Sequence, residues 1–273
     1  MTAMLSENIH PTAVIHPTAK IAENVEIGPY AVIGEDTILH PRVKIGPHSI
    51  VEFAEVGEAT QIHAGAFVGT APQDLKYRGE RTRLILGPGC VVRECVTLNR
   101  GTAATGETKI GARCLFMAYS HVAHDCIIGN EVIVANSVAL AGHVEVGDSA
   151  VLGGLAAVHQ FVRIGKMAMV GGGAMVALDV PPFALAQGDR ARLVGLNLVG
   201  LRRRGYTQEE IASLKKVYRD LFYTDLPLKE QLGHLTQADL LIPAREMVDF
   251  LQKSTRGTCR PARKETPAPD VDA

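Results

Sequence analysis

Tryptophan is absent from the chain, and aromatic residues make up only 5% of its 273 residues. A conventional sandwich or helical-bundle core draws much of its buried area from aromatic side chains, so this composition disfavours both. An excess of charge of one sign is also missing, because the formal net charge is -1. No global field therefore draws the protein toward nucleic acid or an anionic membrane surface. Glycine, by contrast, is plentiful at 27 residues, which favours a narrow aliphatic core with many tight turns.

Cysteines are few and include no CxxC pair: they are Cys90, Cys95, Cys114, Cys126 and Cys259. This spacing disfavours disulfides and structural zinc and fits a reducing compartment. The uncharged tract at residues 167–178 is glycine-rich and too short to span a bilayer. The first residues do not follow the pattern of a signal peptide. We therefore expect a cytoplasmic protein with no membrane insertion.

An aliphatic or aromatic residue recurs every six positions through most of the sequence. The longest uninterrupted run consists of Ile110, Phe116, Val122, Ile128, Val134, Leu140, Val146, Leu152, Val158, Ile164, Val170 and Val176. The same period runs from Ile15 to Val51 and, after a slip of one residue, resumes at Val56. Such repeats are typical of a parallel β-helix, in which each unit is stable only when stacked on its neighbours.

The hexads also predict the dimensions of this β-helix. Three hexads form one triangular coil, so residues 18 apart lie one above the other at about 4.8 Å, the ordinary interstrand distance. The fifth residue of each hexad is small or β-branched, as at Cys114 and Cys126, where a reduced thiol acts as a small hydrophobe. Glycine often follows the aliphatic residue, as at Gly46 and Gly111, where we expect the chain to turn a corner.

Breaks in the period divide the chain into regions. Two polar insertions, near 69–84 and 99–109, predict loops, and loops on a rigid scaffold are often functional. The period ends after two prolines at 181–182, and Thr207 with Glu210 then forms a capping box before a helical pattern, with a second helix expected at about 239–253. We predict a β-helix domain over 1–189, a small C-terminal α-helical domain over 190–257, and a disordered tail over 258–273.

Four histidines fall on neighbouring coils: His121, His124, His143 and His159. Because His124 and His143 are 19 residues apart, one coil plus one step, we expect their side chains to emerge close together on one face. Imidazole titrates near neutrality and suits a general base. Chance placement on a polar outer face and metal binding are the alternatives. Asp125 follows His124 directly, and strand alternation would point its side chain elsewhere.

Several motifs occur in an order that resembles the bacterial UDP-N-acetylglucosamine O-acyltransferases. They are PQDLKY (72–77), LNRGT (98–102), HVAHDC (121–126), LAGHVEVGD (140–148), VHQF (158–161), QGD (187–189), GLNLVGLRRRG (195–205) and STRG (254–257). The resemblance covers residues from about 9 to 257. It implies a homotrimer of left-handed parallel β-helices, each followed by a small helical domain, with sites between subunits.

The reaction implied by this resemblance starts lipid A synthesis. An R-3-hydroxyacyl group passes from acyl carrier protein to the glucosamine 3-OH of UDP-N-acetylglucosamine. No metal or other cofactor is implied beyond the phosphopantetheine that carries the acyl group. A 3-amino analogue of the acceptor remains an alternative.

The resemblance also assigns roles to residues. His124 is the expected general base, Asp125 its hydrogen-bonding partner, and the Gly142 N–H the oxyanion donor. Substrate contacts are expected from Asp74, Lys76, His121, His143, His159 and Gln160. The uridine diphosphate is expected at Asn197, Arg203 and Arg204, where guanidinium groups suit phosphate geometry.

Two positions, Val199 and Gly172, predict how this chain binds the nucleotide and the acyl chain compared with the rest of the family. Val199 stands where the family often has an acidic residue, which removes one nucleotide or ribose contact. Gly172 occupies the position expected to set acyl-chain length. Without a side chain there the acyl groove stays open, so we expect a longer acyl chain, unless Met169 or Met175 closes the groove instead.

Three rival functions share the β-helix. A related hexapeptide N-acyltransferase usually carries an extra N-terminal uridine-binding domain, whereas repeats here begin by about residue 9. A γ-type carbonic anhydrase needs three histidines converging on zinc. A scaffold without chemistry would not need the polar loop with Asp74 and Lys76.

Overall fold

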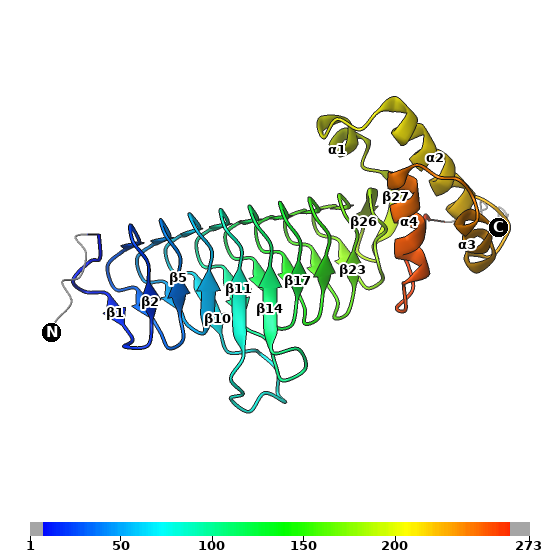
Figure 1. Ribbon diagram of the computed structural model, residues 1–273. Helices are drawn as coiled ribbons and strands as arrows, with labels where there is room; N and C mark the ends of the chain where they lie inside the picture. The colour runs from blue at the N-terminus through cyan, green and yellow to red at the C-terminus, as the bar shows by residue number, and fades with distance from the viewer. Residues whose placement is uncertain (1–7, 263–273) are drawn as a thin grey trace, which may run out of the picture.

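The computed structural model describes residues 8–262 and consists of an elongated β-helix with a group of helices at its C-terminal end (Figure 1). Most strands are two residues long, and three strands complete each turn of the coil. The strands form three long sheets, whose order follows every third strand along the chain as far as β25, after which β26 and β27 are added to the end of one sheet. All pairs between strands are parallel except the last, so the predicted parallel β-helix followed by a small helical part is confirmed.

The strands of each sheet are as follows. The nine-stranded sheet contains β1 (Val14–Ile15), β4 (Val32–Ile33), β7 (Ile50–Val51), β10 (Phe67–Thr70), β13 (Thr97–Asn99), β16 (His121–Val122), β19 (Ala139–Leu140), β22 (Ala157–Val158) and β25 (Met175–Val176). The eight-stranded sheet contains β2 (Lys20–Ile21), β5 (Ile38–Leu39), β8 (Ala54–Val56), β11 (Arg83–Leu86), β14 (Glu107–Ile110), β17 (Ile127–Ile128), β20 (Glu145–Val146) and β23 (Arg163–Ile164). The ten-stranded sheet contains β3 (Glu26–Ile27), β6 (Lys44–Ile45), β9 (Gln61–Ile62), β12 (Val91–Val92), β15 (Leu115–Phe116), β18 (Ile133–Val134), β21 (Val151–Leu152), β24 (Met169–Val170), β26 (Ala184–Gln187) and β27 (Arg192–Leu196).

The strand register confirms the 18-residue coil. Leu115 pairs with Ile133, and His121 pairs with Ala139. The one-residue slip in the sequence is a shorter coil, in which Lys44 pairs with Gln61. The aliphatic residue of each hexad and the small residue at its fifth position both point into the core, as Val122 and Cys126 do. Each such buried aliphatic side chain stabilises the coil by about 1.5–3 kcal/mol.

The corner glycines lie where they were expected, but the physical reason differs. Gly46 and Gly111 do not adopt a positive φ; a Cβ on Gly111 would lie 2.6 Å from the carbonyl oxygen of Gly129 in the next coil. The left-handed conformation falls two residues later and is taken by ordinary residues, such as Asp125 (φ 59°) and His143 (φ 60°). Glycine is therefore needed for the close approach of two coils, and the stacked backbone holds L-residues in a conformation that they seldom adopt.

The inserted loops are shorter than predicted. The first occupies residues 71–82, between β10 and β11, and the second occupies 100–106, between β13 and β14. Their flanking residues extend strands instead, because β11 and β14 pair along four residues, from Arg83↔Glu107 to Leu86↔Ile110. The charged side chains of these strands, Arg83, Glu107 and Lys109, lie on the outer face, so polarity alone did not mark the ends of the loops.

The helical part contains α1 (Leu198–Arg203), α2 (Gln208–Phe222), α3 (Leu228–Thr236) and α4 (Ile242–Gln252). The capping box at Thr207 and Glu210 is present, with both reciprocal hydrogen bonds. The second predicted helix corresponds to α4, whereas α1 and α3 were not predicted. α3 has no side-chain cap and contains a glycine, so its local signal is weak.

Two segments near the C-terminus differ from the prediction. Residues 192–196, assigned to the helical domain, form β27, which pairs antiparallel with β26 and closes the ten-stranded sheet. Residues 258–262, assigned to a disordered tail, are ordered: the Cys259 N–H donates to the Asp179 carbonyl at 2.8 Å, and Cys259 is buried. The remainder of that predicted tail, 263–273, lies outside the described residues.

Candidate active site

Most of the predicted site residues lie along one edge of the β-helix, where the chain passes from the nine-stranded to the eight-stranded sheet. We call this edge the histidine edge. Both inserted loops leave the coil there, and they project from the same region in Figure 1. The next three corners along the edge carry His124 with Asp125, Gly142 with His143, and Gln160 with Phe161. The stacking of coils thus brings residues from five distant stretches of sequence into one row.

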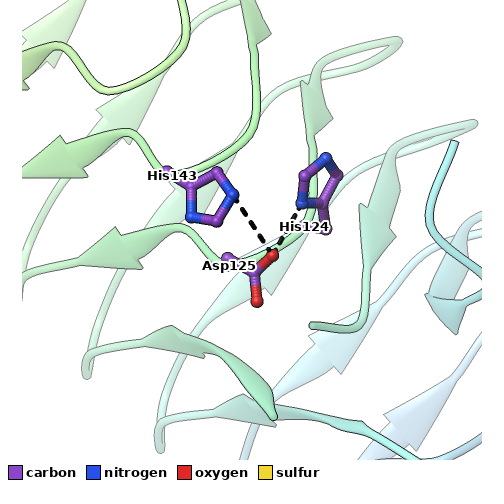
Figure 2. Close-up of side chains that lie close together, drawn as sticks. All are labelled: His124, Asp125 and His143. Atoms are coloured by element: carbon purple, nitrogen blue, oxygen red, sulfur yellow. Dashed lines mark hydrogen bonds and ion pairs between the residues drawn. The ribbon is translucent and has the colours of Figure 1, made fainter. Parts of the chain in front are cut away.

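His124 and Asp125 form a hydrogen-bonded pair. The His124 Nδ1 lies 2.7 Å from Asp125 Oδ2, and both side chains are almost completely buried (Figure 2). The expectation from strand alternation, that Asp125 points elsewhere, is therefore wrong, and the hydrogen bond that the family resemblance implied between these two residues is present. The two residues lie in a corner between β16 and β17, and the positive φ of Asp125 turns its side chain back toward the imidazole. Alternation applies only within a strand.

The Asp125 carboxylate is surrounded by donors. Oδ1 accepts hydrogen bonds from the Thr102 N–H at 2.9 Å and from the Thr105 hydroxyl. Oδ2 accepts from the Thr102 hydroxyl at 2.7 Å as well as from His124. Burial acts to raise the pKa of Asp125, but the hydrogen bonds from Thr105, Thr102 and His124 outweigh it and lower that pKa to about 2. Asp125 is consequently a carboxylate at neutral pH.

His143 lies against the pair from the next coil. Its Nε2 is 3.6 Å from Asp125 Oδ2, so both imidazoles face the same carboxylate oxygen (Figure 2). The ring meets the His124 ring edge-on at a centroid distance of 5.2 Å and stacks on Phe161 at 4.5 Å. The predicted proximity of His124 and His143 is confirmed.

Gly142 lies directly beside the His124 ring. A Cβ at this position would be 2.5 Å from Cε1 of His124 and 2.7 Å from its Nε2, closer than real Cβ atoms approach. The absence of a side chain therefore lets the imidazole pack on the main chain. Within the described residues the Gly142 N–H donates to no protein acceptor, but the same holds for Ala118 at an equivalent corner. An N–H without a protein acceptor is therefore common to such corners. The Gly142 N–H differs from the Ala118 N–H in lying beside the His124 ring.

His121 and His159 do not join this cluster through hydrogen bonds. His121 Nδ1 lies 2.6 Å from the Thr97 hydroxyl, and its pKa is lowered by burial and by the neighbouring His124. His159 is exposed and its Nδ1 accepts from Arg256 at 2.8 Å. Gln160, beside it, is exposed as well. Both histidines nevertheless border the histidine edge, at β16 and immediately after β22.

Asp74 and Lys76 lie in the first loop, where Asp74 Oδ1 accepts from the Lys76 N–H at 2.9 Å. No hydrogen bond or ion pair joins either side chain to the histidines within residues 8–262. The loop is held by Arg100, which sequence reasoning did not single out. Its guanidinium donates to the Tyr77 hydroxyl at 3.0 Å and to the Gly69 carbonyl at 2.8 Å. Arg100 is the arginine of the LNRGT motif, and this motif was the sequence signal that could have identified it. Because Arg100 is buried, its guanidinium requires hydrogen-bonding partners.

The remaining predicted residues lie on the other two edges. Gly172 is in a corner between the ten-stranded and nine-stranded sheets, where an added Cβ would lie 3.3 Å from the Gly154 carbonyl oxygen. Asn197 caps α1 through the Gly200 N–H and donates to the Met167 carbonyl at 3.0 Å. Arg204 pairs with Glu131, whereas Arg203 is exposed. A single chain therefore does not bring these residues to the histidine edge.

His124, Asp125 and His143 are also the described residues that offer grouped metal-ligand atoms, all within 4.8 Å of one another. The group contains two imidazoles, one fewer than a carbonic anhydrase of the γ-type needs. An ionised carboxylate has about four acceptor positions. Here Thr102 and Thr105 fill three of them and His124 the fourth. This arrangement leaves Asp125 poorly suited to bind a metal ion.

Comparison with known proteins first defines a class. Residues 107–142 match the bacterial transferase hexapeptide model, which describes six repeats, and residues 179–259 match the model of UDP N-acetylglucosamine O-acyltransferase, domain 2. Together with a parallel β-helix bearing a histidine–aspartate pair, these matches define a hexapeptide-repeat transferase.

Individual relatives narrow this class to a family. The chain is 47% identical over 255 residues to an acyl-[acyl-carrier-protein]–UDP-N-acetylglucosamine O-acyltransferase of Thermodesulfovibrio yellowstonii, covering 92% of this chain and 99% of the relative. It is 48% identical over 269 residues to the enzyme of that name from Trichlorobacter lovleyi, covering 93% and 99%. The solved structure of UDP-N-acetylglucosamine O-acyltransferase from Moraxella catarrhalis is similar with a TM-score of 0.89, 36% identity, and coverage of 93% and 100%. The chain belongs to the UDP-N-acetylglucosamine O-acyltransferase family and is an acyltransferase.

None of the helices within residues 8–262 combines the length and apolarity needed to cross a bilayer.

Proposed function

We propose that this protein transfers an R-3-hydroxyacyl group from acyl carrier protein to the glucosamine 3-OH of UDP-N-acetylglucosamine, the first step of lipid A synthesis. The observation that carries the proposal is the buried His124–Asp125 pair packed on the main chain at Gly142, in a chain that matches this family over almost its whole length. An acyl transfer to a hydroxyl requires a base and an oxyanion donor, and this corner supplies both kinds of group.

The base in this proposal is His124. Because Asp125 is ionised and accepts from Nδ1, the proton of a neutral imidazole resides on Nδ1 and Nε2 keeps its lone pair. Nε2 has no hydrogen-bond partner within residues 8–262. It takes the proton of the acceptor hydroxyl as that oxygen attacks the thioester carbon. Asp125 then stabilises the imidazolium that results, and a positioned base of this kind contributes roughly 10²–10⁴-fold to the rate.

The tetrahedral intermediate places negative charge on the former carbonyl oxygen. The Gly142 N–H, with no protein acceptor within the described chain, is the proposed donor to this oxyanion. Collapse re-forms the carbonyl and breaks the carbon–sulfur bond. The phosphopantetheine thiolate leaves and receives the proton from the His124 imidazolium, so the base is regenerated.

Substrate binding is proposed from several parts of the chain. Asp74, Lys76, His121, His143, His159 and Gln160 border the histidine edge or its first loop and are the proposed sugar and acyl contacts. Asn197, Arg203 and Arg204 are the proposed uridine diphosphate contacts, since guanidinium groups bind phosphate well. Gly172 is the proposed position that sets acyl-chain length, and its lack of a side chain favours a longer acyl chain.

A homotrimer with left-handed coils is part of the same proposal. The proposed residues occupy three different edges of one chain, so a complete site needs the edge of one chain beside another edge of a second chain. Exposed apolar side chains on the Gly172 edge, Tyr119 and Leu155, are consistent with a covered surface. The acyl carrier protein is the proposed second partner, and the cytoplasm is the proposed location.

The test is acyl transfer from a panel of 3-hydroxyacyl carrier proteins to UDP-N-acetylglucosamine, comparing wild type with His124→Ala. We expect wild-type turnover, with the longer chains preferred, and a loss of roughly 10²-fold or more in His124→Ala while the protein remains folded. Retained activity in the variant would remove His124 from the mechanism. If the wild type uses only a 3-amino acceptor, the proposed acceptor is wrong. Metal analysis of the purified protein tests the carbonic anhydrase alternative.

A further inference from the structure

The second inserted loop, residues 100–106, folds over the carboxylate of Asp125. It contributes three hydrogen bonds to that group: the Thr102 N–H and the Thr105 hydroxyl reach Oδ1, and the Thr102 hydroxyl reaches Oδ2 at 2.7 Å. Asp125 donates its own N–H to the Thr108 hydroxyl at 2.8 Å, just after the loop. Both the side chain and the main chain of Asp125 are therefore held by this segment.

These contacts leave the carboxylate a single orientation. Three of its roughly four acceptor positions are filled by the loop, and the fourth, on Oδ2, faces His124 Nδ1 at 2.7 Å. The Thr105 hydroxyl has one proton and two acceptors within reach, the carboxylate and the Glu107 carbonyl. The ionised carboxylate is the stronger acceptor, so the proton points to Asp125.

The loop itself is built to be rigid. A Cβ on Gly101 would lie 2.4 Å from the Glu107 N, so the two ends of the loop touch through their main chains. The Thr82 hydroxyl donates to the Gly101 carbonyl at 2.6 Å, and the Arg83 N–H donates to the Gly106 carbonyl at 3.0 Å. The threonines are consequently presented to Asp125 from a fixed frame.

We infer that Thr102 and Thr105 are positioning residues for the base: their hydroxyl groups orient Asp125 so that it holds the His124 ring with Nε2 directed at the acceptor hydroxyl. The inference rests on the proposed acyl transfer and adds to it a role for the second loop. Thr105 is the sharper of the two for testing, because Thr105 is an exposed residue, whereas Thr102 is buried and contributes to packing.

The experiment compares Thr105→Val, Thr105→Ser and Thr37→Val with wild type in the acyl-transfer assay. Valine keeps the shape of threonine and removes only the hydroxyl. We expect Thr105→Val to lower kcat about tenfold, because a small displacement of a base lowers the rate of the chemical step. The KM for the acyl carrier protein and the KM for UDP-N-acetylglucosamine should change little. Thr105→Ser should stay within about threefold of wild type, since it keeps the donor. Thr37→Val is the control for loss of a hydrogen-bonded threonine hydroxyl far from the base: Thr37 is buried, its hydroxyl donates to the Val51 carbonyl at 3.1 Å, and it lies coils away from His124.

A double-mutant cycle separates positioning from general loop stability. In an Asp125→Ala background, removing the Thr105 hydroxyl should not lower kcat further, because the carboxylate that this hydroxyl orients is absent. An effect on loop stability alone would instead lower kcat by the same factor in the wild-type and Asp125→Ala backgrounds. Equal losses of kcat in both backgrounds would overturn this inference while leaving the proposed function intact. The same holds if wild type is active and Thr105→Val is as active as wild type. A wild type without any turnover overturns the proposed function, and this inference with it.

Discussion

At the scale of single residues, the site depends on one corner in which a histidine, an aspartate and a glycine are stacked across two coils. Asp125 lies one residue after His124, and Gly142 lies one coil above it. The left-handed conformation of Asp125 turns its carboxylate to the imidazole, and the missing Cβ of Gly142 makes room for the ring. Changes at either position are therefore expected to act mainly through the placement of His124.

Gly142→Ala is expected to lower kcat by about 10²-fold, since its Cβ would displace the His124 ring and a 1 Å shift of a reacting group has an effect of that size. The measurement is kcat together with the thermal unfolding midpoint. Gly154→Ala is the matched control, because it occupies the same corner position two hexads later, where a Cβ would meet only the Asn136 carbonyl oxygen at 3.3 Å. Equal losses of activity in both variants would contradict the role of the His124 contact.

The low pKa of Asp125 predicts how stability depends on pH. Its pKa falls from an ordinary 3.8 to about 2 on folding, so the ionised group stabilises the folded protein above pH 4 or so, and this contribution is lost as the pH falls toward 2. The contribution is on the order of 2 kcal/mol. Asp125→Asn should therefore be less stable than wild type at pH 6, and the difference should narrow between pH 4 and 2. Denaturant unfolding between pH 6 and 2 measures the difference in free energy of unfolding between the two proteins. A difference that stays constant over this range would contradict the low pKa of Asp125.

At the scale of elements, the loops are positioned by a few buried polar contacts rather than by secondary structure. Arg100 leaves the end of β13 and connects the first loop to the coil through Tyr77, with its guanidinium 4.3 Å above the Phe53 ring. Its side chain is only 9% exposed and it also pairs with Glu52 at 3.1 Å. The position of Asp74 and Lys76 thus depends on a contact outside their own loop.

Tyr77→Phe removes the hydroxyl that Arg100 binds and should loosen the first loop. We expect the KM for UDP-N-acetylglucosamine to rise by up to about tenfold, the equivalent of one hydrogen bond, with faster amide hydrogen exchange over residues 71–82. Tyr30→Phe serves as the control, because Tyr30 is exposed and stacks only on His48. An unchanged KM with an unchanged exchange rate would show that Arg100 does not hold the loop through Tyr77.

At the scale of the whole molecule, the coil distributes one proposed site over three edges. His124, the proposed base, lies on the histidine edge, Gly172 lies on a second edge, and Arg204 reaches Glu131 on the third. One coil holds these edges apart, and in the proposed oligomer a neighbouring chain completes the site. The proposed trimer would supply these edges to each site from different chains.

Mixed oligomers test this arrangement directly. His124→Ala and Arg203→Ala chains, each inactive alone, should regain activity when unfolded, mixed in equal amounts and refolded together. If each site takes its base from one chain and its arginine from the next in a cyclic trimer, about a quarter of the sites are intact. No recovery in mixtures that light scattering identifies as trimers would mean that both residues act within one chain. Refolded wild type is the reference for yield.

Much of the architecture was predictable because the same hexad repeat determines which side chains are buried in every coil. An aliphatic residue each six positions has only one way to bury its side chains, which is to stack coils of 18 residues, and the observed register follows it. The same count predicted that His124 and His143 lie close together. The ends of the loops and the ordered residues 258–262 were not predictable, since they depend on pairing with distant partners such as Asp179. α3 was missed because it has no side-chain cap and contains a glycine.

The sequence by itself determined the parallel β-helix, its coil length and the group of histidines on adjacent coils, because these depend on a period that repeats locally. Only the tertiary structure decided the chemistry of the corner. The pairing of His124 with Asp125 depends on a positive φ that the stacked coils impose, and the ionisation of Asp125 depends on Thr102 and Thr105, which lie 20 or more residues earlier in the chain. Periodicity places residues on a face, but it does not specify the direction of a side chain at a corner or the donors that surround it.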